Sequence, residues 1–264
     1  MYLVSNEEMR QLDRTAIETW RIPSLVLMEN AGIAILRQLE RDIPGLYEKR
    51  ITILCGCGNN GGDGLVLARQ LHLAGAAQVA VVIVIDGERR FSADHQANRD
   101  ILERLPVKLI EVDGLSRLGV LKAQLNFSDI AVDCLFGTGL SRDLGELSRA
   151  VCDVLNDKRI LRVAVDIPSG LAGDSGQVCG AAVRADYTYT LAWPKQGLFL
   201  GDAAEFIGQL RVLNIGIPVE VADQAEIQGQ LLTPDMLREK LPSRALNSHK
   251  TASVTSASSP AASA

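Results

Sequence analysis

Apolar and polar positions along the chain alternate between the spacing of buried strands and the spacing of helices. Short apolar runs predict strands at 50–55, 77–85, 107–112, 130–133, 162–166, 187–193 and 209–215. Between them, apolar residues at helical spacing predict helices at 62–75, 92–105, 115–125 and 144–156. Because strands alternate with helices, we predict a three-layer α/β/α, Rossmann-like fold, with a mainly parallel sheet and helices on both faces.

Two amphipathic segments precede the first strand and predict an N-terminal helical extension. Segment 6–20 has helical spacing, acidic residues in its first turn, and Ser5 or Asn6 as its cap. A second helix, capped by Ser24, is expected to run to about residue 41.

Composition then narrows the class of protein. Apolar residues make up 47% of the 264 residues and aromatic residues only 4%, so the core is expected to consist of small aliphatic side chains. The net charge is −5 and no basic stripe is visible, which argues against a nucleic-acid partner. The first residues lack the layout of a signal peptide, and no apolar run reaches the roughly 18 residues of a membrane span. We therefore expect a soluble, cytoplasmic protein.

The first loop with candidate chemistry is GCGNNGGDG (56–64), between a predicted strand and a helix. Its glycines allow positive φ angles and close approach of a ligand to the backbone, and the helix N-terminus suits an anion such as phosphate. The simpler interpretation is a tight strand-to-helix turn. The spacing Gly56-x-Gly58-x-x-Gly61 also fits the dinucleotide fingerprint, with Asp86 as a ribose ligand, but that fingerprint alone is weak.

Two further loops each place a carboxylate at the end of a buried strand. They are VDCLFGTGL (132–140), with Asp133, and VDIPSGL (165–171), with Asp166. The simpler interpretations are a capped loop for the first and an ordinary β-turn for the second.

The carboxyl ends of parallel neighbouring strands meet at one edge, so we expect Asn60, Asp133 and Ser169 to lie close together. Their oxygens suit a hard cation, and a single carboxylate among neutral oxygens favours a monovalent one. Asp166 would then be left as an ionisable group facing the ligand.

These segments resemble the YjeF N-terminal domain, the family of NAD(P)H-hydrate epimerases. The resemblance spans about residues 3–218. It is carried by NEEMRQLD (6–13), IPSLVLMENAG (22–32), GNNGGDGLVLARQL (58–71), VDCLFGTGL (132–140), VDIPSGL (165–171) and ADYTYTLAWPKQGL (185–198).

The resemblance implies an isomerase of cofactor repair. Such proteins interconvert the R and S epimers of hydrated NADH and NADPH, which carry a hydroxyl at C6 of the nicotinamide ring. It also implies a potassium ion on Asn60, Asp133 and Ser169, and a homodimer. The residues it implies for substrate binding are Asn59, Asn60, Gly61, Gly62, Asp63, Gly137, Thr138, Gly139, Leu140, Ser141, Arg142, Asp143 and Asp166.

Epimerisation at C6 must break and remake a bond at a carbinolamine carbon. The ring nitrogen can push electrons while an acid assists departure of the hydroxyl. Asp166 is the candidate general acid/base, because a strand-end carboxylate near a low-dielectric pocket can have a raised pKa. Lys195 is expected either to contact phosphate or to share the proton transfer. Preference for the NADH or the NADPH hydrate stays open.

The end of the chain divides into two predicted segments. Residues 219–250, with a predicted helix at 233–241, resemble the linker and the opening of an ADP- or ATP-dependent dehydratase domain. Residues 251–264 are rich in Ala and Ser and uncharged, which predicts disorder. The sequence therefore predicts an epimerase domain over 1–218 and no dehydratase activity.

Two other functions are weighed against the epimerase. An NAD(P)-dependent oxidoreductase shares the glycine fingerprint, but no paired proton donor and hydride-acceptor pocket is recognisable. A non-catalytic nucleotide-binding or scaffold protein is the second alternative. The presence of Asn60, Asp133, Asp166 and Ser169 together argues against it.

Overall fold

The computed structural model describes residues 1–140, 142–232 and 236. Tyr2–Gln230 form one compact unit. The predicted helix at 233–241, apart from Met236, and the predicted tail at 251–264 lie outside the described residues.

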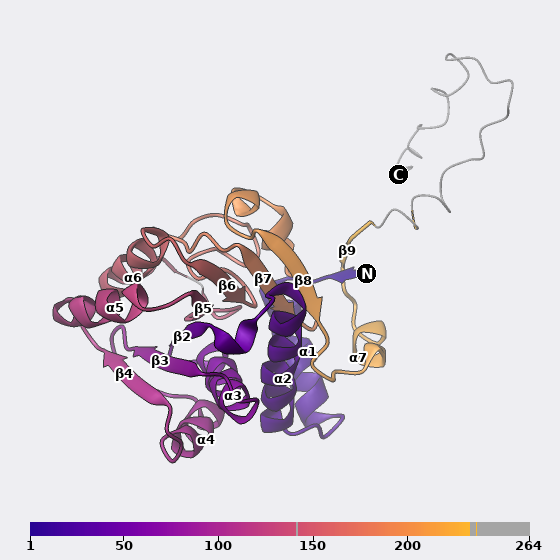
Figure 1. Ribbon diagram of the computed structural model, residues 1–264. Helices are drawn as coiled ribbons and strands as arrows, with labels where there is room; N and C mark the ends of the chain where they lie inside the picture. The colour runs from indigo at the N-terminus through magenta and orange to yellow at the C-terminus, as the bar shows by residue number, and fades with distance from the viewer. Residues whose placement is uncertain (141, 233–235, 237–264) are drawn as a thin grey trace, which may run out of the picture. The chain divides into compact units, whose positions relative to one another are not determined.

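A seven-stranded sheet forms the middle layer of the compact unit, in the order β4-β3-β2-β5-β6-β7-β8 (Figure 1). Every neighbouring pair is parallel. The strands are β2 (Arg50–Cys55), β3 (Gln78–Val84), β4 (Lys108–Val112), β5 (Ile130–Cys134), β6 (Leu161–Val165), β7 (Tyr187–Leu191) and β8 (Gln209–Leu213). All seven predicted strands are present, and the predicted mainly parallel sheet is confirmed.

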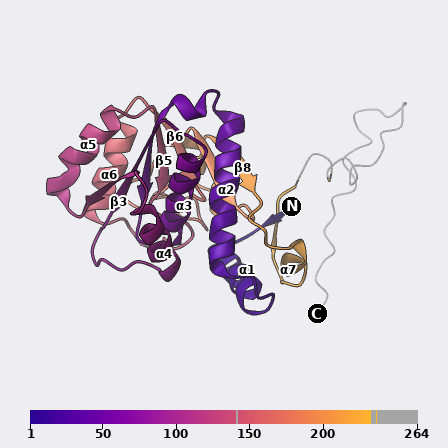
Figure 2. The ribbon, with the colours of Figure 1, turned by 60° about the horizontal axis from the view of Figure 1, so that its bottom comes forward.

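Helices cover both faces of this sheet (Figures 1 and 2). One face packs against α1 (Asn6–Glu18), α2 (Ser24–Asp42), α3 (Asn59–Leu73) and α4 (Ala93–Leu102). The other packs against α5 (Leu118–Asn126) and α6 (Glu146–Asn156). Ile53 and Leu54, neighbours in β2, enter the two different clusters, and both are 0% exposed. The three-layer Rossmann-like prediction is therefore confirmed.

The strand order reverses at β2, which lies between β3 and β5. The chain runs outward from β2 through β3 to β4 and then returns to β5 on the other side. In the register of β2 and β5, Cys55 lies beside Cys134, so both strands end at the same level. Ligands of open parallel sheets bind at such a switch point, beyond the carboxyl ends of the strands.

The helical extension matches the prediction except at one cap. Ser5 caps α1 in a capping box, in which its hydroxyl accepts from the Glu8 amide at 3.1 Å and its amide donates to the Glu8 carboxylate at 2.6 Å. The prediction that Ser24 caps α2 is wrong, because Pro23 is the N-cap and Ser24 is already the first helical residue. Proline suits this point, where its missing N–H removes no helical hydrogen bond.

The remaining elements are short. β1 (Tyr2–Leu3) pairs antiparallel with β9 (Gly229–Gln230), and α7 covers Val219–Asp223. Short 3-10 turns occur at Leu46–Glu48, Leu115–Arg117, Gln196–Phe199 and Ala203–Glu205. The compact unit thus includes α7 and β9, beyond the boundary at 218 that the sequence suggests; that boundary stays a prediction. Across the part of the chain that the structure describes, no helix is long and apolar enough to cross a membrane.

Candidate functional site

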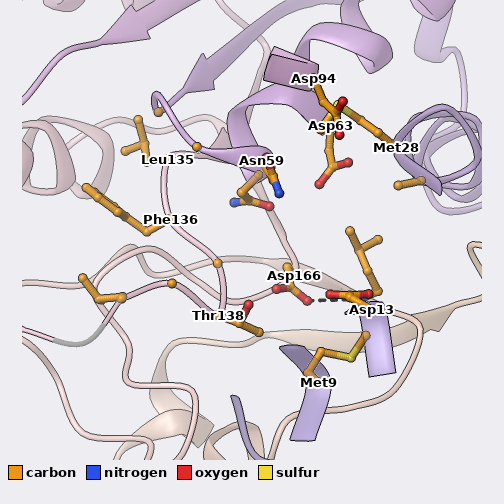
Figure 3. A pocket seen from close by; sticks show the side chains of 18 of the residues that line it. Met9, Asp13, Met28, Asn59, Asp63, Asp94, Leu135, Phe136, Thr138 and Asp166 are labelled. Carbon is orange, nitrogen blue, oxygen red and sulfur yellow. Dashed lines mark hydrogen bonds between the residues drawn. The ribbon is translucent and has the colours of Figure 1, made fainter. Parts of the chain in front are cut away.

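A cavity of about 580 Å³ lies beyond the carboxyl ends of β2 and β5, at the switch point (Figure 3). Its walls come from α1, from α2, from the loops that follow β2, β3 and β5, and from the segments that follow β6 and β7. The three loops that the sequence singles out therefore meet at one cavity, and the N-terminal helices close it from another side.

The loop after β2 enters α3 earlier than expected. The sequence predicts a helix from residue 62, whereas α3 begins at Asn59, with Gly58 as its N-cap. A hydrogen bond joins the Gly62 amide to the Gly58 carbonyl at 3.1 Å. The helix makes no use of the amides before Gly62, so these are available to an anion at the helix N-terminus. Asn59, Asn60 and Asp63 all line the cavity.

The glycines from Gly58 to Gly64 do not use positive φ angles, which corrects the prediction, and two of them serve close packing. None of Gly58, Gly61, Gly62 and Gly64 is among the residues with positive φ. A Cβ on Gly61 would lie 1.9 Å from the Gly56 carbonyl oxygen, and one on Gly62 would lie 2.6 Å from the Met28 side chain. Gly61 and Gly62 are buried and do not line the cavity, so they let α3 approach the end of β2.

Asp133 and Ser169 form a buried pair beneath the loops. Each is 1% exposed. The Ser169 hydroxyl donates to Asp133 Oδ1 at 2.6 Å, and the Ser169 amide donates to Oδ2 at 2.8 Å. Burial raises the pKa of Asp133 to about 6, although the hydrogen bonds from Ser169 and from the Leu135 amide lower it. The predicted proximity of the second and third loops is therefore confirmed.

Asn60 reaches the same two loops from α3. Its Nδ2 donates to the Val165 carbonyl, the last of β6, at 3.3 Å. A Cβ on Gly137, in the loop after β5, would lie 3.5 Å from Asn60 Cγ. Asn60 Oδ1 is buried and has no hydrogen-bond partner. A buried amide oxygen without a donor is a group for which a cation is a suitable partner.

Asp166 and Lys195 form a buried ion pair at the cavity. The Lys195 side chain is 1% exposed and that of Asp166 is 11% exposed. The Lys195 ammonium donates to Asp166 Oδ1, and also to the Leu191 carbonyl at 2.8 Å and the Thr190 hydroxyl at 3.3 Å. All three donors of the ammonium are thus used inside the protein. This arrangement favours Lys195 as the fixed partner of Asp166 over a role in contacting phosphate.

The backbone at this pair is held in an uncommon conformation. Asp166 directly follows β6 with a φ of 68°, and Ala192 directly follows β7 with a φ of 60°. Left-handed backbone in residues other than glycine costs roughly 1–3 kcal/mol and persists where the surroundings fix it. The Asp166 amide donates to the Tyr189 carbonyl at 2.8 Å, and the Ala192 amide donates to the Leu213 carbonyl at 2.8 Å. These hydrogen bonds hold the backbone in place at Asp166 and at Ala192, which lies three residues before Lys195.

The residues of the turn after β5 line two different cavities. Gly137, Thr138, Gly139 and Leu140 line the main cavity, as expected of substrate-binding residues. Arg142 and Asp143 line a smaller adjacent hollow of about 420 Å³. Ser141, also predicted to bind substrate, lies outside the described residues.

Asp86 has a structural partner that the dinucleotide interpretation does not anticipate. Its carboxylate accepts a hydrogen bond from the Ser148 amide at 3.0 Å, in the first turn of α6. A Cβ on Gly145 would lie 2.4 Å from the same carboxylate. Asp86 therefore caps α6, although it also borders the cavity. It is not the free carboxylate that a ribose ligand of the fingerprint requires.

Asp13, on α1, is a cavity residue that the sequence reasoning missed. It lines the cavity, and burial raises its pKa to about 6, with Lys195 lowering it and Asp166 raising it. Burial also raises the pKa of Asp63 well above its usual range, with Asp166 and Asp13 adding to the effect. The sequence does contain a signal for Asp13, because it is an acid within the apolar stripe of a helix. The buried apolar residues around it are Met9, Leu12 and Ala16.

The sequence of this chain is similar to a known protein family and to individual proteins. The family described as "YjeF-related protein N-terminus" matches residues 24–197. The chain is 41% identical over 251 residues to the bifunctional NAD(P)H-hydrate repair enzyme Nnr of Moorella thermoacetica, covering 95% of this chain and 47% of that protein. It is 37% identical over 221 residues to an NAD(P)H-hydrate epimerase of Rhodopirellula baltica, covering 84% of this chain and 87% of the relative.

One solved structure is similar over most of its length. The crystal structure of yeast ynu0, YNL200c, superposes with a TM-score of 0.69 at 25% identity, and the match covers 88% of this chain and 98% of the yeast chain. The chain spans about half the length of the bifunctional relatives it matches, 47% of one and 45% of another from Thermofilum pendens.

Proposed function

Because the chain belongs to the family of YjeF-related protein N-termini, we propose that it is an NAD(P)H-hydrate epimerase, an isomerase that interconverts the R and S epimers of hydrated NADH and NADPH. The observation that carries this proposal is the buried Asp166–Lys195 pair, which borders the same cavity as the N-terminus of α3. A dinucleotide needs an anion site for its pyrophosphate and a proton-transfer group for its reactive ring, and one cavity offers both.

The binding mode follows from the elements around the cavity. The amides at the start of α3, at Asn59 and Asn60, would hold the pyrophosphate, since a helix N-terminus attracts anions. The nicotinamide end would lie toward Asp166, against Gly137, where a Cβ would come within 2.9 Å of Asp166 Oδ2. Because glycine has no Cβ, residue 137 does not cover this carboxylate oxygen with a side chain.

The reaction follows from the chemistry of a carbinolamine. The lone pair of the ring nitrogen N1 forms a double bond to C6 while the C6–O bond breaks, and the departing hydroxyl takes up a proton to leave as water. Water then adds to the other face of the iminium and loses a proton. Lys195 holds Asp166 in place through Oδ1, and a carboxylate there would both stabilise the cationic ring and accept the proton of the incoming water.

A potassium ion on Asn60, Asp133 and Ser169 is part of this proposal. The support is the buried, unpartnered Asn60 Oδ1 together with the buried Asp133 carboxylate and Ser169 hydroxyl at the ends of the adjacent strands. Among residues 1–140, 142–232 and 236, no group of three or more His, Cys, Asp or Glu could hold a metal. One carboxylate among neutral oxygens suits a monovalent cation. When bound, the ion would supply a positive charge beside Asp133 and fix the three loops.

The test is an assay on separated R and S hydrates of NADH and NADPH, resolved by chromatography, with a blank that lacks protein. We expect conversion of each epimer into the mixture, and a fall of about 10²–10⁴-fold in turnover for Asp166→Asn, the range that general acid–base catalysis supplies. A wild-type protein that leaves both epimers unchanged would overturn the proposal. Consumption of NADH with a carbonyl substrate would favour an oxidoreductase instead.

The cytoplasmic location and the homodimer stay predictions. Sedimentation of the purified chain tests the second of them.

A further inference from the structure

We propose that Asp13 is a second catalytic residue of this reaction, which donates a proton to the departing C6 hydroxyl, while Asp166 accepts a proton from the incoming water. The inference rests on the proposed epimerase function and deepens it, because it assigns the two proton transfers to two different carboxyl groups.

The position of Asp13 is fixed by the attachment of α1 to the rest of the site. Before α1, the Val4 amide donates to the Pro194 carbonyl at 3.0 Å, and the Gln196 amide donates to the Val4 carbonyl at 2.9 Å, on either side of Lys195. Within α1, Arg10 Nη1 donates to the Thr138 carbonyl at 3.2 Å. The start of the chain is therefore tied both to the Lys195 segment and to the turn after β5.

Asp13 faces the cavity from this anchored helix. Figure 3 shows its carboxylate turned toward the cavity that Asp166 also borders. Asp13 is only partly exposed, and its helical neighbours Met9, Leu12 and Ala16 are buried in the core. No hydrogen bond or ion pair to its carboxylate occurs within the described part of the chain. A carboxyl group in a half-buried position without a partner is costly to keep, and such positions are typical of functional sites.

The two carboxylates have opposite surroundings. Asp166 Oδ1 accepts hydrogen bonds from the Lys195 ammonium and from the Leu191 amide, the latter at 3.3 Å. No hydrogen-bond donor to Asp13 occurs among the described residues, and burial raises its pKa more than Lys195 lowers it, with a smaller rise from Asp166. Two carboxyl groups in one site whose surroundings differ in this way can act as base and acid in the same reaction.

The chemistry of epimerisation can use this division. When N1 forms its double bond to C6, the hydroxyl leaves with the Asp13 proton as water. A second water adds to the opposite face of C6 and transfers its proton to Asp166. One water is released and one is taken up, so the atoms balance, and exchange of protons with solvent restores both groups. In the reverse direction, from the other epimer, Asp166 donates its proton to the departing hydroxyl and Asp13 accepts a proton from the incoming water.

The experiment uses the full chain, with Asp13→Asn, Asp13→Glu and the control Glu18→Gln, which changes an exposed acid of the same helix. Interconversion of separated epimers is measured in water enriched in ¹⁸O, with a protein-free blank. We expect wild type to incorporate one labelled oxygen per inversion and Asp13→Asn to lose about 10²-fold or more in kcat. Asp13→Glu should recover part of that loss, and Glu18→Gln should match wild type.

A pH profile keeps the proposal falsifiable if Asp13→Asn folds poorly, which its circular dichroism would show. The charged groups around Asp13 are Asp166 and Lys195, with Asp63 on α3 and Arg10 on its own helix. Because the donor must be protonated, wild-type kcat should fall as pH rises above about 6. A flat profile from pH 5 to 8, or full activity in a folded Asp13→Asn, overturns the assignment of Asp13. Absence of activity in wild type overturns the epimerase function itself, which separates the two failures.

Discussion

The ammonium of Lys195, 1% exposed, donates to the carboxylate of Asp166, and it joins the segment after β7 to the segment after β6. Removing one partner of a buried ion pair leaves an uncompensated charge, whose cost is typically about 3–5 kcal/mol. We therefore expect Lys195→Met to lower the free energy of unfolding by about that amount. Urea denaturation at pH 7, with the slope of the transition compared to wild type, measures the change.

Two further variants separate charge from packing in that experiment. Lys122→Met removes an exposed lysine of α5 and should leave stability within about 0.5 kcal/mol of wild type. Adding Asp166→Asn to Lys195→Met removes the stranded carboxylate and should recover part of the loss. If Lys195→Met is as stable as Lys122→Met, the Asp166–Lys195 pair contributes nothing to the free energy of unfolding.

Asp13 should make the protein less stable as pH rises. Its pKa is 3.8 in the unfolded chain and about 6 in the folded one, so between these values the folded state holds a proton that the unfolded state has released. Stability contributed by this group is therefore present below about pH 4 and is lost progressively up to about pH 6. At 1.36 kcal/mol per pKa unit the loss is about 3 kcal/mol.

Because Asp63 and Asp133 also have raised pKa values, the measurement is a difference between two proteins. Free energies of unfolding for wild type and Asp13→Asn, compared between pH 4 and pH 8, should diverge, with the variant relatively more stable at pH 8. Parallel curves over that range would contradict the raised pKa of Asp13.

The strands and the three loops were predictable because both depend on local patterns. A strand buried on both faces is an unbroken apolar run, so β2 was placed from Arg50 to Cys55 without tertiary information. Parallel strands end at one edge, and that geometry alone brings Asp133 and Ser169 into hydrogen-bond contact. Glycine clusters in turn mark the loops where backbone approaches closely.

What each of these residues contacts was not predictable, because it depends on segments distant in the sequence. The glycines of the first loop were expected to allow positive φ angles and close approach of a ligand, yet the constraint on Gly61 is the Gly56 carbonyl packed against it. The weak dinucleotide fingerprint offers Asp86 as a ribose ligand, but its carboxylate caps the N-terminus of α6 through the Ser148 amide, 62 residues later in the chain. Asp13 belongs to no motif, and only the packing of α1 places it at the cavity.

Potassium should raise the melting temperature if the proposed ion site exists. Ligands that bind only the folded state stabilise it, by about 2.7 kcal/mol at a hundred times the dissociation constant. For a domain of this size each kcal/mol is worth roughly 2–4 °C. We expect a higher melting temperature in potassium chloride than in choline chloride at equal ionic strength, measured by differential scanning fluorimetry.

Variants of the two asparagines at the start of α3 provide the control for that shift. Asn60→Ala removes the buried, unpartnered Oδ1 and should abolish the potassium-dependent shift. Asn59→Ala changes its neighbour and should retain it. Equal shifts in both variants would place the ion elsewhere, and no shift in wild type would remove potassium from the proposal.

Gly61 and Gly58 lie three residues apart and should respond oppositely to alanine. A Cβ on Gly61 would lie 1.9 Å from the Gly56 carbonyl oxygen, so α3 must move away from β2, whereas a Cβ on Gly58 meets nothing within 4 Å. Overpacking of this kind costs about 1–3 kcal/mol, and alanine in place of glycine at the N-cap costs less than about 1 kcal/mol. Urea denaturation of Gly61→Ala and Gly58→Ala should show this order. Equal stabilities would mean that the loop relaxes freely, and that the close approach of α3 does not set the shape of the cavity.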